Sequence, residues 1–156
     1  MALRKTAFVK VSGDLISRPD VVEWLRSVAS TRYTVVCVGG GTQINEEFRR
    51  RGLKIEFGPL GRRTNTFTER QLAKNVLEDN QAMVQDLLFE KGIYASVEIP
   101  VLNIGSVLCH VNGDVFVRAA YLGFDDLYVL TYESRKADKE KGFEGLRKVN
   151  VVSFPD

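Results

Sequence analysis

Several features are scarce in this sequence of 156 residues, which has two cysteines, one histidine and one tryptophan. It has no apolar run long enough to cross a membrane and no signal-peptide pattern at the N-terminus. Cys37 and Cys109 lie in apolar, strand-like runs, so we expect buried free thiols, as in the reducing cytosol. With His110 they still lack a fourth ligand at a recognisable spacing, so no metal site is predicted. These absences favour a cytoplasmic protein with no membrane partner.

Charge of one sign is also scarce, because the formal net charge is only +2. This balance does not predict a nucleic-acid partner. The basic clusters at 49–51, 62–63 and 135–136 lack the interleaved aromatic residues of a nucleic-acid motif, so we expect them to be solvated. With 44% hydrophobic and 27% charged residues the composition is globular. The length predicts one domain over residues 1–156.

Apolar periodicity predicts strands and helices that alternate along the chain. The expected strands cover residues 6–11, 34–38, 94–99, 127–131 and 149–154. The expected helices cover residues 19–30, 42–51, 66–91 and 115–122. Asp114 is expected to cap the last of these helices. The alternation indicates an α/β fold, a three-layer α-β-α sandwich with a mostly parallel sheet.

The segments between these elements are less regular. Residues 53–61 are expected to be irregular because they contain several Gly and Pro breakers. Residues 100–111 are expected to form a strand or a loop, and residues 133–142 a loop or a short helix.

The helix over 66–91 is the longest one expected, and Thr66 and Glu69 have the spacing of a capping box at its start. Its expected apolar face consists of Leu72, Val76, Met83, Val84, Leu87 and Leu88. Such a face packs on the sheet or forms a contact in a homodimer or larger homo-oligomer, and the sequence leaves both open.

A glycine triplet, Gly39, Gly40 and Gly41, joins the strand over 34–38 to the next helix. Glycine allows a tight turn and a close approach of the backbone. The free N–H groups at the start of the following helix make this an anion-binding corner. A tight turn without a ligand explains the triplet equally well.

Three further groups of residues have chemistry that suits the same kind of site. Lys10, Ser12 and Gly13 follow the first strand, Arg62 and Thr64 lie in a basic loop, and Asn112 and Asp114 precede a helix. In α/β sheets, ligands bind beyond the carboxyl ends of the strands. Two cations, two glycine turns and a carboxylate suit phosphoryl transfer, which relies on positioning and charge neutralisation.

The order of these motifs resembles the amino-acid kinase superfamily, which includes acetylglutamate kinase, aspartokinase, carbamate kinase and uridylate kinase. The first strand of the family ends in Lys-x-Gly/Ser-Gly, and residues 10–13 match it as Lys-Val-Ser-Gly. Residues 38–41 are similar to the second glycine turn of the family, and residues 61–64 to its arginine loop. Residues 112–114, Asn-Gly-Asp, are similar to its Asn-Ala-Asp motif.

The resemblance implies ATP and Mg²⁺ as cofactors and a small anionic substrate. It implies that Lys10 contacts the transferred phosphoryl group, that Arg62 grips the anionic group of the acceptor and that Asp114 orients the lysines. The phosphate and substrate are then held by the remaining polar and glycine positions, which are Ser12, Gly13, Gly39, Gly40, Gly41, Thr64 and Asn112.

The chain is shorter than the domains of that family, and Tyr132 stands where the family has an aspartate. A second phosphate-binding lysine is not assigned, since Lys136, Lys139, Lys141 and Lys148 are all available. Two functions therefore stay open. One is ATP-dependent phosphoryl transfer to an amino-acid carboxylate or a nucleoside monophosphate. The other is a non-catalytic relative that binds a small anion or nucleotide, or serves only in oligomeric assembly. A generic nucleotide-binding module ranks last, because the triplet lacks Gly-x-Gly-x-x-Gly spacing.

Overall fold

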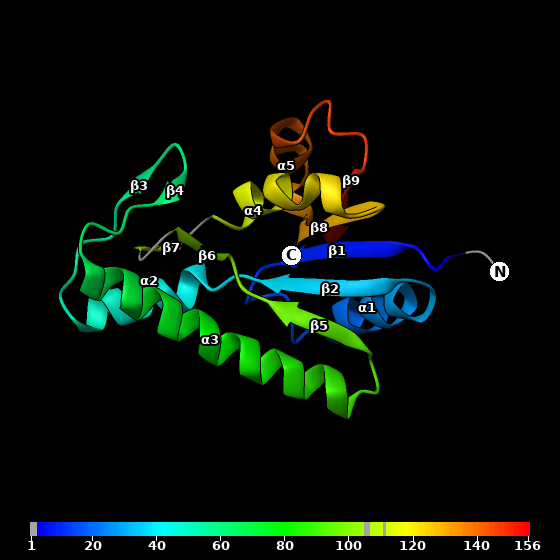
Figure 1. Cartoon of the computed structure of the whole chain (residues 1–156), viewed down its shortest axis with the longest axis horizontal. Coiled ribbons are helices and arrows are strands. Elements are labelled where there is room, and N and C mark those ends of the chain that lie inside the picture. Colours follow the sequence, from blue (N-terminus) through cyan, green and yellow to red (C-terminus); the bar gives the residue numbers. More distant parts are fainter. Residues whose placement is uncertain (1–2, 105–106, 111) are drawn as a thin grey trace.

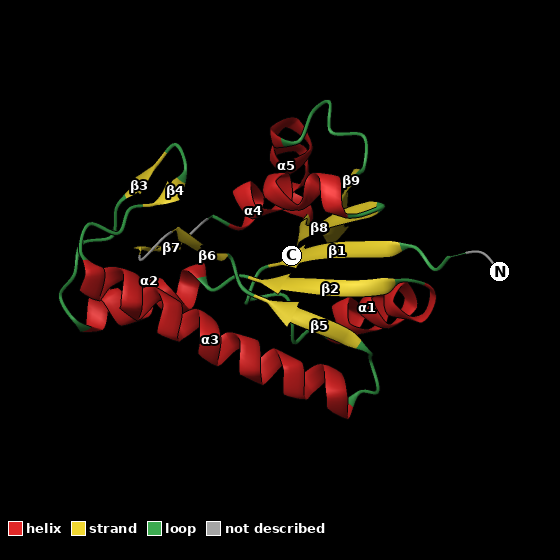
Figure 2. Ribbon diagram, viewed as in Figure 1, coloured by secondary structure: helices red, strands yellow, loops and turns green. Residues whose placement is uncertain are grey.

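A computed structural model describes residues 3–104, 107–110 and 112–156. Five parallel strands form one sheet in the order β5-β2-β1-β8-β9 (Figure 1). The strands are β1 (Thr6–Val11), β2 (Tyr33–Val38), β5 (Ala95–Glu98), β8 (Asp126–Tyr132) and β9 (Val149–Phe154). Figure 2 shows the sheet between helices. The expected α/β sandwich with a parallel sheet is confirmed.

The central strand β1 brings Lys10 to the carboxyl edge of the sheet, between its neighbours β2 and β8. Its Lys10 lies beside Cys37 of β2 and Val129 of β8. Side chains alternate along a strand, so Phe8 and Lys10 point to one face of the sheet and Val9 to the other. Since all five strands are parallel, their carboxyl ends meet at one edge, where α/β proteins bind ligands.

Helices α1 (Pro19–Thr31) and α3 (Phe67–Glu90) cover one face of the sheet. Pro19 takes the first position of α1, where its missing N–H costs nothing. The buried stripe of α1 packs with the end of α3 over the inward side chains of β1 and β2. This cluster includes Val9, Val11, Val21, Leu25, Val36, Val38, Val84 and Leu88.

The other face is covered by α4 (Gly113–Ala120) and α5 (Lys136–Gly142). Short 3-10 turns at Tyr121–Gly123 and Glu133–Arg135 connect these helices to β8. The core on this face consists of Phe8, Cys37, Val117, Leu127, Val129 and Phe143. The alternation of β1 therefore places Lys10 on the face that α4 and α5 cover.

Helix α2 (Gly41–Arg50) packs against the first half of α3 beyond the edge of the sheet (Figure 1). Their shared cluster is Ile44, Phe48, Leu72, Ala73 and Leu77. Two small antiparallel hairpins complete the chain. One joins β3 (Phe57–Gly58) to β4 (Gly61–Arg62), and the other joins β6 (Val101–Ile104) to β7 (Val107–His110). The first hairpin corrects the expectation that residues 53–61 are wholly irregular.

Helix α3 confirms its predicted capping box, because Thr66 and Glu69 exchange hydrogen bonds with each other's backbone. Its predicted apolar face is only partly right. Met83 is 61% exposed, whereas the buried positions are Leu72, Ala73, Leu77, Asn80, Val84 and Leu88. These recur at helical spacing, and Met83 falls beside the stripe, where it faces solvent.

The start of α4 also differs from the expectation. Asn112, not Asp114, is the cap, because the Asn112 Oδ1 accepts a hydrogen bond from the Asp114 backbone N–H at 2.9 Å. Asp114 lies in the first turn of α4 instead. Its carboxylate is thereby left to contact side chains from other elements.

Cys37 is a buried free thiol, as expected. Burial raises the pKa of this thiol to about 12. The side chains of Cys109 and His110 lie outside the described part of the structure. Among the helices described, none combines the length and apolar character that a bilayer crossing requires. The compartment and the oligomeric state stay predictions.

The core on the α1 face supports a stability prediction. Leu25 is fully buried against β1 and β2, so Leu25→Ala should lower the free energy of unfolding by about 2–5 kcal/mol. Urea denaturation measures this change. Leu122 is 91% exposed, and Leu122→Ala should stay within about 0.5 kcal/mol of the wild type. Equal losses in the two variants would contradict the packing described.

Candidate functional site

A cleft of about 280 Å³ lies at the carboxyl ends of β1 and β2. Loops after both strands, the starts of α2 and α4, hairpin β3–β4 and helix α5 all contribute to its wall. Nine of the ten residues that the sequence singled out line it, namely Lys10, Ser12, Gly13, Gly39, Gly40, Gly41, Arg62, Asn112 and Asp114. Thr64 is the exception, because it follows β4 outside the cleft lining. We call this cavity the anion cleft.

The carboxylate of Asp114 joins two lysines on one wall of the anion cleft. Its Oδ1 lies 3.4 Å from the Nζ of Lys10, and its Oδ2 accepts a hydrogen bond from the Nζ of Lys139. Lys10 comes from β1, Asp114 from α4 and Lys139 from α5. The aliphatic part of the Lys10 side chain passes close to Gly113, and a Cβ at that position would lie only 2.8 Å from the Lys10 Cε. A glycine in the Asn-Gly-Asp sequence therefore avoids a clash with Lys10.

Burial and neighbouring charges shift the pKa values of Lys10 and Asp114 in opposite directions. Burial lowers the pKa of Lys10, whose side chain is only 12% exposed, while the nearby Asp114 carboxylate raises it. Burial also disfavours the ionised form of Asp114, but attraction to Lys10 and Lys139 prevails and holds its pKa below the ordinary value. Asp114 is therefore a carboxylate at neutral pH.

Lys139 is the second lysine on the Asp114 carboxylate. It is one of the four lysines that the sequence offered for a second phosphate-binding position, and that role stays a prediction. Lys139 and Asp114 are 25 positions apart, on different helices. No local pattern marks Lys139, because its place depends on how α5 packs across β8 and β9.

The glycine turn forms another part of the cleft wall. The Gly39 N–H donates to the Val11 carbonyl at 2.9 Å, which ties the turn to the end of β1. Gly40 is the N-cap of α2 and no side chain caps that helix, so its first N–H groups lie open at the cleft. Gly13 packs against this turn, since a Cβ there would lie 3.0 Å from the Gly39 carbonyl oxygen.

Arg62 closes the cleft from hairpin β3–β4. Its guanidinium carbon lies 5.5 Å from the ring centroid of Phe48 and 4.9 Å from that of Phe57. The residue is only 9% exposed, and its Nη2 donates to the Gly41 carbonyl at 3.1 Å. Its Nε and Nη1 are buried without a hydrogen-bond partner among the described residues. Burial lowers the pKa of Arg62.

Gly61 of the hairpin packs closely against the Asn112 side chain at the start of α4. Gly61 has a φ of +100°, which glycine adopts without strain, and a Cβ there would lie 2.6 Å from the Asn112 Cβ. This contact places Arg62 and Asn112 in one cleft although they are far apart in sequence.

Some residues that line the cleft were not among the site residues predicted from the sequence. Gln43 and Asn45, on the first turns of α2, each bury a side-chain oxygen without a hydrogen-bond partner among the described residues. Arg135 lines the cleft beside Lys139 and lies over the ring of Tyr132 at 5.9 Å. Within the described chain, no three His, Cys, Asp or Glu side chains gather as a metal site.

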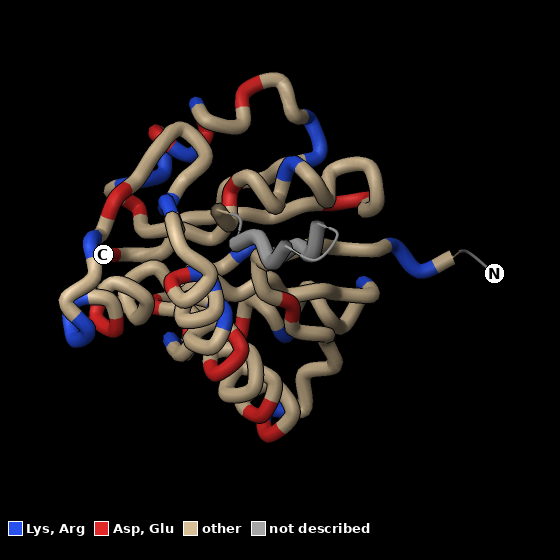
Figure 3. Tube along the Cα trace, turned by 60° about the vertical axis from the view of Figure 1, so that its left-hand side comes forward, with Lys and Arg blue, Asp and Glu red and all other residues tan. Residues whose placement is uncertain are grey.

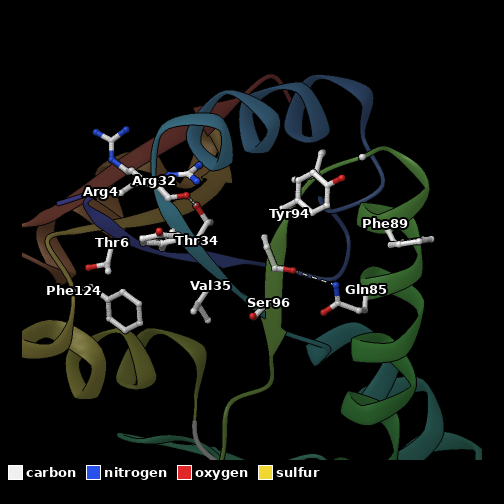
Figure 4. A pocket seen from close by; sticks show the side chains of 14 residues that line it. Arg4, Thr6, Arg32, Thr34, Val35, Gln85, Phe89, Tyr94, Ser96 and Phe124 are labelled. Carbon is white, nitrogen blue, oxygen red and sulfur yellow. Dashed lines mark hydrogen bonds between the residues drawn. The ribbon is translucent and has the colours of Figure 1, made fainter. Parts of the chain in front are cut away.

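A second hollow of about 640 Å³ lies near the amino ends of β1 and β2 (Figure 4). Its two arginines already have partners. Arg32 donates to Asp126 at 2.9 Å, and Arg4 donates to the Ala29 carbonyl and lies over the Tyr33 ring. This hollow therefore lacks the unpartnered cation that marks the anion cleft.

No protein-family model matches the sequence, and no curated protein sequence matches it. A solved structure with a similar fold is N-acetylglutamate synthase from Neisseria gonorrhoeae, in complex with coenzyme A and N-acetylglutamate. The identity is 12% and the TM-score is 0.53, over 83% of this chain and 42% of the other. This chain thus spans less than half the length of that enzyme. The comparison supports a fold of the amino-acid kinase-like class.

The same comparison corrects the cofactor expectation. The resemblance to amino-acid kinases implied ATP and Mg²⁺, whereas this structural neighbour binds coenzyme A and N-acetylglutamate. The ATP and Mg²⁺ expectation is therefore wrong by this comparison, and we set it aside.

Removing the shared carboxylate tests the electrostatics of the lysine pair. Asp114→Asn should lower the free energy of unfolding at about pH 7 by about 1–3 kcal/mol, because two close cations lose their counter-ion. The pKa of Asp114 in the folded protein lies below 3.8. Its contribution is therefore present above that value and is lost as the pH falls through the folded pKa. Urea denaturation should show the difference shrinking at low pH, and a constant difference would contradict this electrostatic account.

Proposed function

We propose that this chain binds a small molecule through an anionic group, a phosphate or a carboxylate, held in the anion cleft. The observation that carries the proposal is the buried Arg62 guanidinium, whose Nε and Nη1 lack partners among the described residues. A buried donor without an acceptor is costly, and a charged one more so. We infer that an anion bound against Arg62 in the cleft supplies the missing acceptor.

The charge of the lining points the same way. Four lining side chains are cationic and two are carboxylates, so the formal balance is +2. The cations are Lys10, Arg62, Arg135 and Lys139, and the carboxylates are Asp14 and Asp114. Lysine and arginine charges are scattered along with acidic ones over the rest of the trace (Figure 3). A concentrated positive lining with open helix N–H groups favours anions.

The size of the cleft limits the ligand. At about 280 Å³ it lies just below the range of about 300–1,000 Å³ that is typical of ligand pockets. It suits a compact phosphorylated or carboxylated molecule. Arg62 offers a planar fork that matches carboxylate and phosphate oxygens, while Lys10 and Lys139 offer point charges.

The proposal is tested by titrating the protein with inorganic phosphate, pyrophosphate and acetylglutamate in a calorimeter. We expect at least one of these anions to bind. Arg62→Ala and Lys10→Ala should each weaken that binding by about 10–100-fold, because each removes a charge-assisted contact.

The matched control is Lys54→Ala, because the Lys54 side chain is 85% exposed and lies outside the cleft lining. This variant should bind the same anion with wild-type affinity. Absence of binding by the wild type, or equal losses in all three variants, would refute the proposed function.

Phosphoryl transfer between small anions is a second candidate, favoured by the pair Lys10 and Lys139 on one carboxylate. Two cations beside bound oxygens neutralise the charge that builds up as a phosphoryl group moves. An acceptor oxygen forms a bond to phosphorus, the donor P–O bond breaks, and the donor oxygen leaves with the electron pair.

This second candidate is tested with acetyl phosphate as donor and aspartate, acetylglutamate or inorganic phosphate as acceptor, followed by phosphorus NMR. Transfer should yield acetate and a phosphorylated acceptor, and Lys10→Ala and Lys139→Ala should each abolish it. If the wild type binds these anions and transfers no phosphoryl group between them, the cleft is a binding site only.

A further inference from the structure

Helix α3 carries one polar residue in its buried stripe. Asn80 is 6% exposed and lies between Leu77 and Val84, which are both buried. An amide buried on an apolar stripe loses its hydration, so it needs a protein partner. The only polar member of the stripe thus calls for an explanation in its contacts.

The partner of Asn80 is the glycine turn. Its Nδ2 donates to the Gly39 carbonyl oxygen at 3.2 Å. A carbonyl oxygen only accepts hydrogen bonds, so this contact fixes which end of the amide faces the turn. The residues are 41 positions apart, and the bond joins the covering helix to the wall of the anion cleft.

The geometry of one peptide unit gives this bond a consequence for the cleft. In a trans peptide the C=O and the following N–H point in opposite directions. With the Gly39 carbonyl drawn toward α3, the Gly40 N–H is directed away from α3. Gly40 lines the cleft, and its N–H makes no backbone hydrogen bond among the described residues.

Packing holds Gly40 in the same arrangement. A Cβ on Gly40 would lie 2.7 Å from the Asn80 Nδ2 and 3.1 Å from the Leu77 Cδ2. Helix α3 therefore packs directly against Gly40, and its side chains fill the space on that side of the glycine. The free side of this peptide is the one toward the cleft.

We propose that Asn80 is a positioning residue for the anion cleft, which holds the Gly39 carbonyl toward α3 and thereby directs the Gly40 N–H at the bound anion. This inference rests on the proposed function, because it assigns a role in anion binding at the same site. Asn80 acts through the peptide and does not touch the ligand.

The test compares the wild type with Asn80→Leu and Asn80→Asp. Leucine keeps the branched shape of the side chain without the donor, and aspartate puts a negative charge beside the Gly39 carbonyl. Inorganic phosphate is the probe, with calorimetry and the amide NMR signal of Gly40 as readouts. In the wild type, phosphate should shift that signal. Both variants should lose the shift and bind phosphate about five- to tenfold more weakly, close to the loss of one hydrogen bond.

Asn75→Leu is the matched control, because Asn75 is exposed on α3 and its side chain accepts a hydrogen bond from Gln71 of the same helix. It should bind phosphate as the wild type does. If Asn80→Leu does not fold, Asn80→Ala takes its place with the same expectation, because alanine also has no donor. Wild-type affinity in a folded Asn80 variant, or a Gly40 signal that phosphate leaves unmoved in the wild type, overturns the inference while anion binding stands. A wild type that binds no phosphate, pyrophosphate or acetylglutamate overturns the proposed function itself.

Discussion

The parallel direction of the five strands is the constraint on which the other features of this structure depend. Antiparallel neighbours would send their loops to opposite edges, whereas parallel strands bring all their carboxyl ends to one edge. Each strand must then return through a connection, and the helices in those connections cover both faces. Because β1 is central, its end receives residues from β2, α4 and α5 at the same time.

The electrostatics of the anion cleft follow from that convergence. Lys10 sits at the end of a covered strand, where burial opposes its charge. The covering helices bring Asp114 within 3.4 Å of its Nζ, and Lys139 to the same carboxylate. One carboxylate between two lysines leaves a surplus positive charge, and Arg62 adds another from the hairpin. The lining of this cleft therefore concentrates positive charge, although the net charge of the whole chain is only +2.

Helix α3 connects the core to the cleft. Its second half packs with α1 over the sheet, and its first half packs with α2. Asn80 lies between these two clusters and bonds the glycine turn. Helix α3 is thus one of the helices that cover the sheet, and it also contacts the glycine turn that lines the cleft.

The sequence by itself determined the elements and the fold class. Strand and helix signals are local, because they depend on apolar spacing, caps and breakers a few residues apart. This is why Thr66 and Glu69 predicted the start of α3, and why Lys10, Gly39 and Asp114 were selected from the ends of elements. The β3–β4 hairpin was missed, since its strands have two residues each and its Gly and Pro content is typical of a loop.

Only the tertiary structure decided which distant side chains meet. Lys139, Arg135 and Asn80 have no local pattern that marks them, because their positions depend on how α5 and α3 pack against the sheet. Met83 is apolar and was predicted to lie on the buried face of α3, but it is exposed. The buried face is decided by the elements that α3 packs against. The cap of α4 is Asn112 and not Asp114, because the helix begins at Gly113, two residues before the expected start. Residue type and position near strand ends were enough to predict candidate site residues, whereas packing across the sheet decided which of them line one cleft.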